Sequence, residues 1–106
     1  MGADLTDANL SGALLIGANF TKADLTRANL RGVGIMIADF TNADLTDADL
    51  SGADWGAFLG PTLTDAVLAG TIVDSNVSLP PDWKRDPESG RVNYAPPDQQ
   101  GSAAPS

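Results

Sequence analysis

The sequence has no histidine and no cysteine among its 106 residues. Histidine is the commonest general base of enzymes, and cysteine supplies the thiol nucleophile. The many aspartates recur at one regular position, as residues of a fold motif do, and a straight row of them lacks the convergent geometry of an oxygen-ligand metal site. The sequence therefore predicts a non-catalytic protein without cofactor or metal. Without cysteine, disulfide bonds are excluded.

Basic residues and long apolar runs are also scarce. Six Lys and Arg oppose fourteen Asp and Glu, a formal net charge of −8, so the basic surface typical of nucleic-acid-binding proteins is missing. No apolar run approaches the roughly 18 residues of a membrane span, and the N-terminus lacks the layout of a signal peptide. We expect a soluble protein that binds neither membrane nor nucleic acid directly. Its expected place is the cytoplasm, or a virion if a phage encodes it.

What the chain has instead is a repeat of five residues. Small residues recur at Ala3, Ala8, Ala13, Ala18, Ala23, Ala28, Val33, Ala38, Ala43, Ala48 and Ala53. Two places after each comes a larger apolar residue: Leu5, Leu10, Leu15, Phe20, Leu25, Leu30, Ile35, Phe40, Leu45, Leu50 and Trp55. Asp or Asn stands between them in nine of eleven cases. A helix would spread this period around its surface and a strand would alternate it between faces, so the pattern indicates a repeating bend.

The phrases Ala-Asp-Leu-Thr-Asp, Ala-Asn-Leu-Ser-Gly and Ala-Asn-Phe-Thr-Lys resemble those of pentapeptide-repeat proteins. The resemblance implies an all-β fold, a right-handed four-sided parallel β-helix in which each pentapeptide forms one side and four make a coil. It covers residues 1–75, about three and a half coils, which exceeds the roughly three repeats that a solenoid needs. Residues 76–106 follow as a Pro-rich tail, either extended or capping.

Reading every twentieth residue predicts the four sides of the helix. Leu5, Leu25 and Leu45 mark the first side, Leu10, Leu30 and Leu50 the second, Leu15, Ile35 and Trp55 the third, and Phe20 and Phe40 the fourth. After Trp55 the frame shifts, and we interpret the shift as a deletion of two residues. This interpretation assigns Phe58 to the fourth side, Leu63 to the first, Leu68 to the second and Val73 to the third.

The outward Asp4, Asp24 and Asp44 form a predicted acidic column on the first side. Such a column could imitate a row of DNA phosphates. The simpler interpretation is that Asp and Asn make the local hydrogen bonds of turns and keep a solenoid soluble.

On the third side the outward positions are apolar, which is the sharper signal. Leu14, Ile16, Met36 and Ile37 lie on adjacent predicted coils, and a contiguous apolar patch of this kind is seldom left bare on a soluble monomer. Two explanations stay open. Another chain covers the patch, or the tail folds back onto it with Leu79, Trp83 or Tyr94.

These observations lead to two functional hypotheses. The first is an interaction module, a structural or assembly component of a bacterial complex or phage virion. It would dock on itself or on a larger protein assembly through Leu14, Ile16, Met36, Ile37, Trp83 and Tyr94, and through an N-terminal end that has no cap. The second, implied by the family resemblance, is a DNA mimic that binds gyrase or another topoisomerase through Asp4, Asp24 and Asp44.

Overall fold

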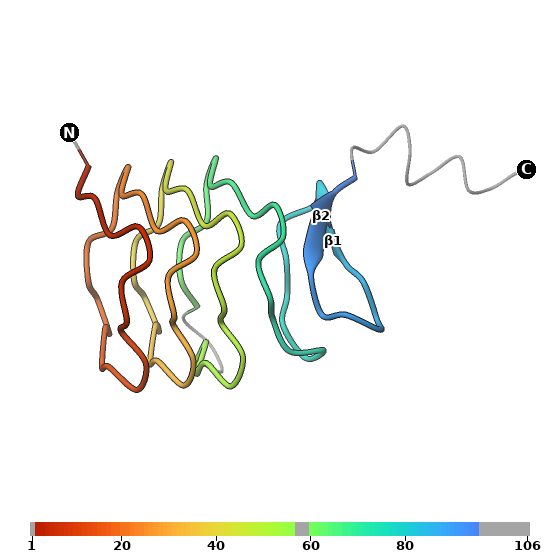
Figure 1. Cartoon of the computed structure of the whole chain (residues 1–106), viewed down its shortest axis with the longest axis horizontal. Coiled ribbons are helices and arrows are strands. Elements are labelled where there is room, and N and C mark those ends of the chain that lie inside the picture. The colour runs from red at the N-terminus through yellow and green to blue at the C-terminus, as the bar shows by residue number, and fades with distance from the viewer. Residues whose placement is uncertain (1, 57–59, 96–106) are drawn as a thin grey trace, which may run out of the picture.

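The computed structural model describes residues 2–56 and 60–95. Over this part the chain is all-β, with a stack of coils followed by one hairpin (Figure 1). None of these residues forms a helix long and apolar enough to cross a bilayer.

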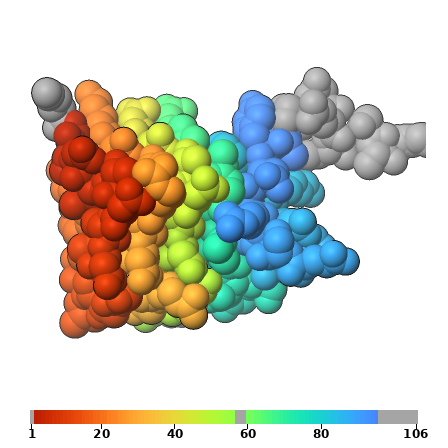
Figure 2. Space-filling model, viewed as in Figure 1, coloured from red at the N-terminus to blue at the C-terminus, as the bar shows by residue number. Residues whose placement is uncertain are grey.

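Four columns of parallel bridges hold the coils together. Each bridge joins residues 20 apart as far as Asp54, and successive columns are offset by five residues. The columns run Asp4–Asp24–Asp44–Val67, Asn9–Asn29–Asp49–Ile72, Leu14–Gly34–Asp54 and Asn19–Asp39–Thr62. In Figure 2 the coils stack as a continuous block along the long axis. The four predicted sides are therefore present, one for each column.

A β-turn follows each inward apolar residue and produces the bend. In the first one the Ala8 amide donates to the Leu5 carbonyl at 3.0 Å, and the third turn residue, Asp7, has a φ of 62°. A positive φ at this place is the signature of a type II turn. The same left-handed conformation returns every five residues, for example at Gly12 and Gly17. The period of five is thus one short bridge plus one turn.

The core is a stack of inward apolar residues along the helix axis. Leu25, Leu30 and Phe40 are fully buried, and the rings of Phe20 and Phe40 stack with centroids 5.2 Å apart, which confirms that they share a side. In the first coil Leu5 and its counterparts are only partly buried. The second coil is therefore enclosed on both faces, while the first is covered on one.

The frame shift after Trp55 is an insertion of three residues, and our interpretation of a deletion was wrong. Bridges now join residues 23 apart: Asp39 to Thr62, Asp44 to Val67 and Asp49 to Ile72. These pairings place Leu63 on the fourth side, Leu68 on the first and Val73 on the second. The assignment of Phe58 lies outside the described residues.

A hairpin of β1 (Trp83–Arg85) and β2 (Val92–Tyr94) follows the last coil. It bonds to the end of the solenoid, because Gly70 N donates to Val92 O at 2.7 Å and Val92 N donates to Thr71 O at 2.8 Å. Val92 is fully buried there, and Figure 1 shows the hairpin at the C-terminal end of the stack. It covers part of a strand edge that would otherwise be open.

Candidate interaction surface

Outward Asp and Asn side chains make local hydrogen bonds on every side. In nine units the side-chain Oδ1 accepts from the backbone amide two residues later, from Asp4 with Thr6 to Asp54 with Gly56. A hydrogen bond from the Thr26 hydroxyl, followed by one from its amide, lowers the pKa of Asp24. These carboxylates therefore stabilise the turns.

The acidic column of the first side is brought together as predicted, since Asp24 bridges both Asp4 and Asp44. Basic side chains interrupt the negative charge around it. Arg27 binds Asp7 with two hydrogen bonds of 2.8 and 3.0 Å. The column then ends at Val67. The turn positions of the first side, Asp7, Arg27 and Asp47, consequently alternate in charge beside the row of three aspartates.

On the third side the local bonds are missing from two coils, because the Asp or Asn position holds Leu14 and Gly34. Leu14 is 83% exposed, Ile16 51% and Ile37 48%. Met36 is half-buried. These four residues form the apolar patch.

Glycines provide the floor of the apolar patch. A Cβ on Gly34 would lie 3.5 Å from Leu14 Cδ2 and 3.8 Å from Ile16 Cγ1, and one on Gly56 would lie 2.8 Å from Met36 Cγ. The side chains of one coil therefore rest on the backbone of the next. This packing makes the patch contiguous and leaves its apolar tips turned toward solvent.

Ile37 has an unusual backbone conformation. Its φ is 52°, a left-handed conformation that is a true outlier for a β-branched residue. The other non-glycine residues with positive φ in these turns are Asp, Asn, Lys or Arg. Sequence reasoning placed Ile37 in the patch but missed its strain, although an isoleucine at the turn position of the period was a signal for it. Strain of this kind collects at functional sites.

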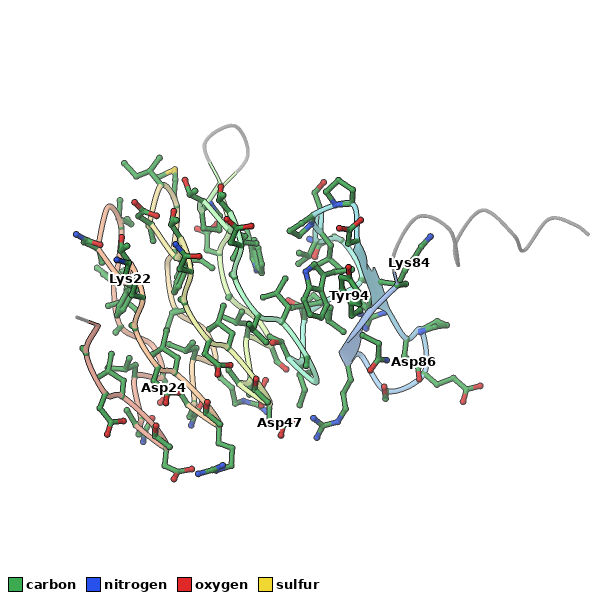
Figure 3. The ribbon with its side chains drawn as sticks, turned by 90° about the horizontal axis from the view of Figure 1, so that it is seen from above. Lys22, Asp24, Asp47, Lys84, Asp86 and Tyr94 are labelled. Atoms are coloured by element: carbon green, nitrogen blue, oxygen red, sulfur yellow. The ribbon has the colours of Figure 1, made fainter. Side chains whose placement is uncertain are left out.

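The described part of the tail does not cover the apolar patch. Leu79 and Trp83 pack against the core, and the Trp83 and Tyr94 rings meet edge to face at 5.2 Å. Figure 3 shows Tyr94 on the hairpin, far along the molecule from Lys22 and Asp24. Trp83 and Tyr94 thus form a second location, apart from Leu14, Ile16, Met36 and Ile37. The interpretation that they fold back onto the patch was wrong.

Pentapeptide repeats match this sequence in eight copies, over residues 1–33 and 38–55. The chain belongs to the pentapeptide-repeat family. Within this pentapeptide-repeat protein, the gap in the match covers residues 34–37, which include Gly34, Met36 and Ile37. The departure from the family pattern therefore includes Met36 and Ile37 of the apolar patch.

Solved pentapeptide-repeat proteins are similar to this chain. One from the cyanobacterium Cyanothece 51142 is 32% identical over 69% of this chain and 51% of its own, with a TM-score of 0.44. One from Nostoc Pcc 7120 is 34% identical over 79% of this chain and 75% of its own, with a TM-score of 0.40. A third, involved in heterocyst differentiation regulation in Nostoc sp. Strain PCC 7120, is 34% identical over 74% of this chain and 40% of its own, with a TM-score of 0.28.

This chain thus spans about half the length of the Cyanothece protein. A search of curated proteins found no match. No group of three or more acidic, His or Cys side chains that could hold a metal ion occurs among residues 2–56 and 60–95.

Proposed function

We propose that this pentapeptide-repeat protein is a non-catalytic interaction module that docks through its apolar patch on a protein surface. The observation that carries the proposal is the exposed set of Leu14, Ile16 and Ile37 on rigid, hydrogen-bonded coils. A bare apolar patch of this kind marks an interaction site. The strained Ile37 and the local departure from the family pattern support it.

The partner in this proposal is a second copy or a neighbouring subunit of a larger assembly. The partly buried inward residues of the first coil offer a further apolar contact beside the patch. Preformed coils lose little conformational entropy on docking, which favours a structural or assembly role.

Two charges placed in the apolar patch test this proposal. In Leu14→Lys with Ile16→Lys both side chains stay outward, so the β signal in circular dichroism should persist. Association should fail, because two ammonium groups would lose water at the contact. The matched control is Thr6→Lys with Ser11→Lys, which adds the same charges to the same coil on the first and second sides and should leave association unchanged.

Native mass spectrometry reports self-association, and a photocrosslinking amino acid at position 16 reports any other partner. We expect a discrete crosslinked product from position 16 and none from position 11 in the native host. A chain that stays monomeric and forms no product from position 16 would contradict the proposal.

The alternative is a DNA mimic that binds gyrase. It is supported by the stacking of Asp4, Asp24 and Asp44, and opposed by Arg27 beside them. The test is gyrase supercoiling at micromolar protein, where we expect no inhibition. Salt-sensitive inhibition that disappears when the three aspartates become asparagine would favour the mimic instead.

A further inference from the structure

The last coil ends in an unpaired strand edge on the fourth side. Among residues 2–56 and 60–95, the amides of Leu63 and Asp65 and the carbonyl of Pro61 have no hydrogen-bond partner. Leu63 is correspondingly only half-buried, whereas Phe40 on the same side is 1% exposed. An unpaired edge of this kind is a template for another strand.

The preceding coil shows which groups would complete this edge. Phe40 N donates to Thr62 O at 2.8 Å, Asn42 N donates to Thr64 O at 2.9 Å, and Thr62 N donates to Ala38 O at 2.8 Å. In the same register, one residue of an added strand would accept from Leu63 N and donate to Pro61 O. The residue two places later would accept from Asp65 N. The edge therefore offers three main-chain hydrogen bonds to an added strand, at Leu63 N, Pro61 O and Asp65 N.

A groove runs beside this edge. Two adjoining cavities of about 490 and 320 Å³ share Leu63, Asp65 and Pro80 in their linings. The second cavity is also lined by the edge-to-face pair of Trp83 and Tyr94. In the part of the chain that the structure describes, neither the Trp83 indole N–H nor the Tyr94 hydroxyl has a hydrogen-bond partner. The groove therefore combines an apolar wall with polar groups that could bind a peptide.

The hairpin limits which kind of partner can bind at this end of the solenoid. It already occupies the end of the second side, where Val73 N donates to Gly90 O at 3.0 Å and Val92 N donates to Thr71 O at 2.8 Å. A whole coil of another β-helix would need that edge as well. A single extended strand needs only the fourth side, so the space fits a peptide and excludes end-on stacking of a second copy.

The negative charge beside the groove favours a basic residue in the peptide. Asp65 and Asp82 both line the second cavity, and the structure gives neither side chain an ion pair among the described residues. Asp65 follows Lys22 and Asn42 at the turn position of the fourth side. The peptide residue at that corner would therefore lie near Asp65, and a basic side chain would be favoured there.

We propose that this groove binds an extended peptide segment of a partner protein, which adds as a strand to the edge formed by Pro61, Leu63 and Asp65. A large apolar side chain of the peptide stacks on Leu63 beside Trp83. A Lys or Arg two residues later faces Asp65. This is recognition by strand addition, in which main-chain hydrogen bonds give affinity and side-chain positions give specificity. The site is separate from the apolar patch and independent of the function proposed for it.

The probe is the blocked peptide acetyl-Asn-Phe-Thr-Lys-amide, which has the sequence that this chain itself uses on the fourth side, at residues 19–22. Titrated into the ¹⁵N-labelled full chain, it should shift the amide resonances of Leu63 and Asp65 and the Trp83 indole resonance in a saturable way. Resonances of the apolar patch should not move. Saturable shifts elsewhere, or none at Leu63 and Asp65, would overturn the proposal.

Two matched peptides test the register. N-methylation of the peptide Asn removes the donor to Pro61 O and should abolish the shifts. N-methylation of the peptide Phe alters an amide that points away from the edge and should preserve them. Equal binding by both peptides would contradict strand addition.

The charge prediction uses Asp65→Asn, because Asn42 shows that asparagine fits this turn position with a φ of 60°. Binding of the Lys peptide should weaken about two- to fivefold, the range of an exposed ion pair, while a peptide with norleucine in place of Lys should be unaffected. A Lys peptide that binds the variant and the wild type equally would remove the basic specificity from the proposal.

The chain's own residues 96–106 are the competing occupant. A chain ending at Ala95, checked for folding by circular dichroism, should bind the probe with the same affinity as the full chain. Binding that appears only after this truncation would mean that the groove serves the chain's own tail, and would overturn a partner segment.

Discussion

The first and third sides of the solenoid share one backbone and differ in what they present outward. Both bury an apolar residue in the second coil, Leu25 or Ile35. Outward, the first side has Asp24 bonded to its own turn, whereas the third has Leu14 and Gly34 at that position and a strained Ile37. The third side thus lacks these local hydrogen bonds and contains a strained residue, and such departures from local rules are typical of functional sites.

The largest expected effect tests whether the inward residues of the first and third sides are equally buried. Leu25→Asp and Ile35→Asp should each unfold the protein, at a cost above about 4 kcal/mol, because an unpaired carboxylate would be buried between coils. Circular dichroism would show loss of the β signal in both. A folded Ile35→Asp would mean that the third side is looser than its burial indicates.

The next comparison uses equivalent outward positions. Asp24→Ala should lower the free energy of unfolding more than Leu14→Ala does, because it removes the acceptor for the Thr26 amide and hydroxyl. Leu14→Ala should change it by less than about 0.5 kcal/mol, since that side chain is 83% exposed. Urea denaturation measures both. Asp24→Asn keeps an acceptor oxygen and serves as the control.

A reciprocal exchange tests the strain at Ile37. Ile37→Asn should stabilise the fold by about 0.5–1 kcal/mol, because asparagine tolerates a left-handed conformation better than a β-branched residue does. Asn42→Ile, at the equivalent turn of the fourth side, should destabilise it by a similar amount. Thermal unfolding would show opposite shifts of the two midpoints. Equal and unchanged midpoints would mean that Ile37 is not strained.

The smallest effect is expected from pH. The Thr26 and Thr41 hydroxyls, through their hydrogen bonds, lower the pKa of Asp24 and Asp39. A lowered folded-state pKa adds stability that is complete above the unfolded-state pKa and disappears as pH falls through the folded-state value. The urea midpoint should therefore fall between pH 5 and pH 2. Asp24→Asn should show a smaller fall, and Leu14→Asn on the third side the same fall as wild type.

Most of the fold could be predicted because its rules are local. A five-residue unit contains one bridge and one turn, so the inward position of Leu25 and Leu30, and the shared side of Phe20 and Phe40, follow from counting. The apolar patch was also predictable, because Leu14 and Ile37 break a polar pattern.

The separation of Trp83 and Tyr94 from the patch was not predictable. Those residues pack on the C-terminal end through contacts with the last coil. The tail has no sequence repeat from which these contacts could be predicted. The groove at Leu63 and Asp65 likewise depends on where the hairpin packs against the last coil.

The sequence by itself determined the period of five, the four sides and the polar or apolar character of each outward position, because each depends on a few neighbouring residues. It could not determine the register after Trp55. A deletion of two residues and an insertion of three leave the same phase in a five-residue repeat, so Leu63 fits inward on either interpretation. Only the tertiary structure decided between them, since the bridge from Asp39 to Thr62 fixes which side lies beneath which. Hydrogen bonds between coils, which the local pattern does not encode, select the fourth side for Leu63.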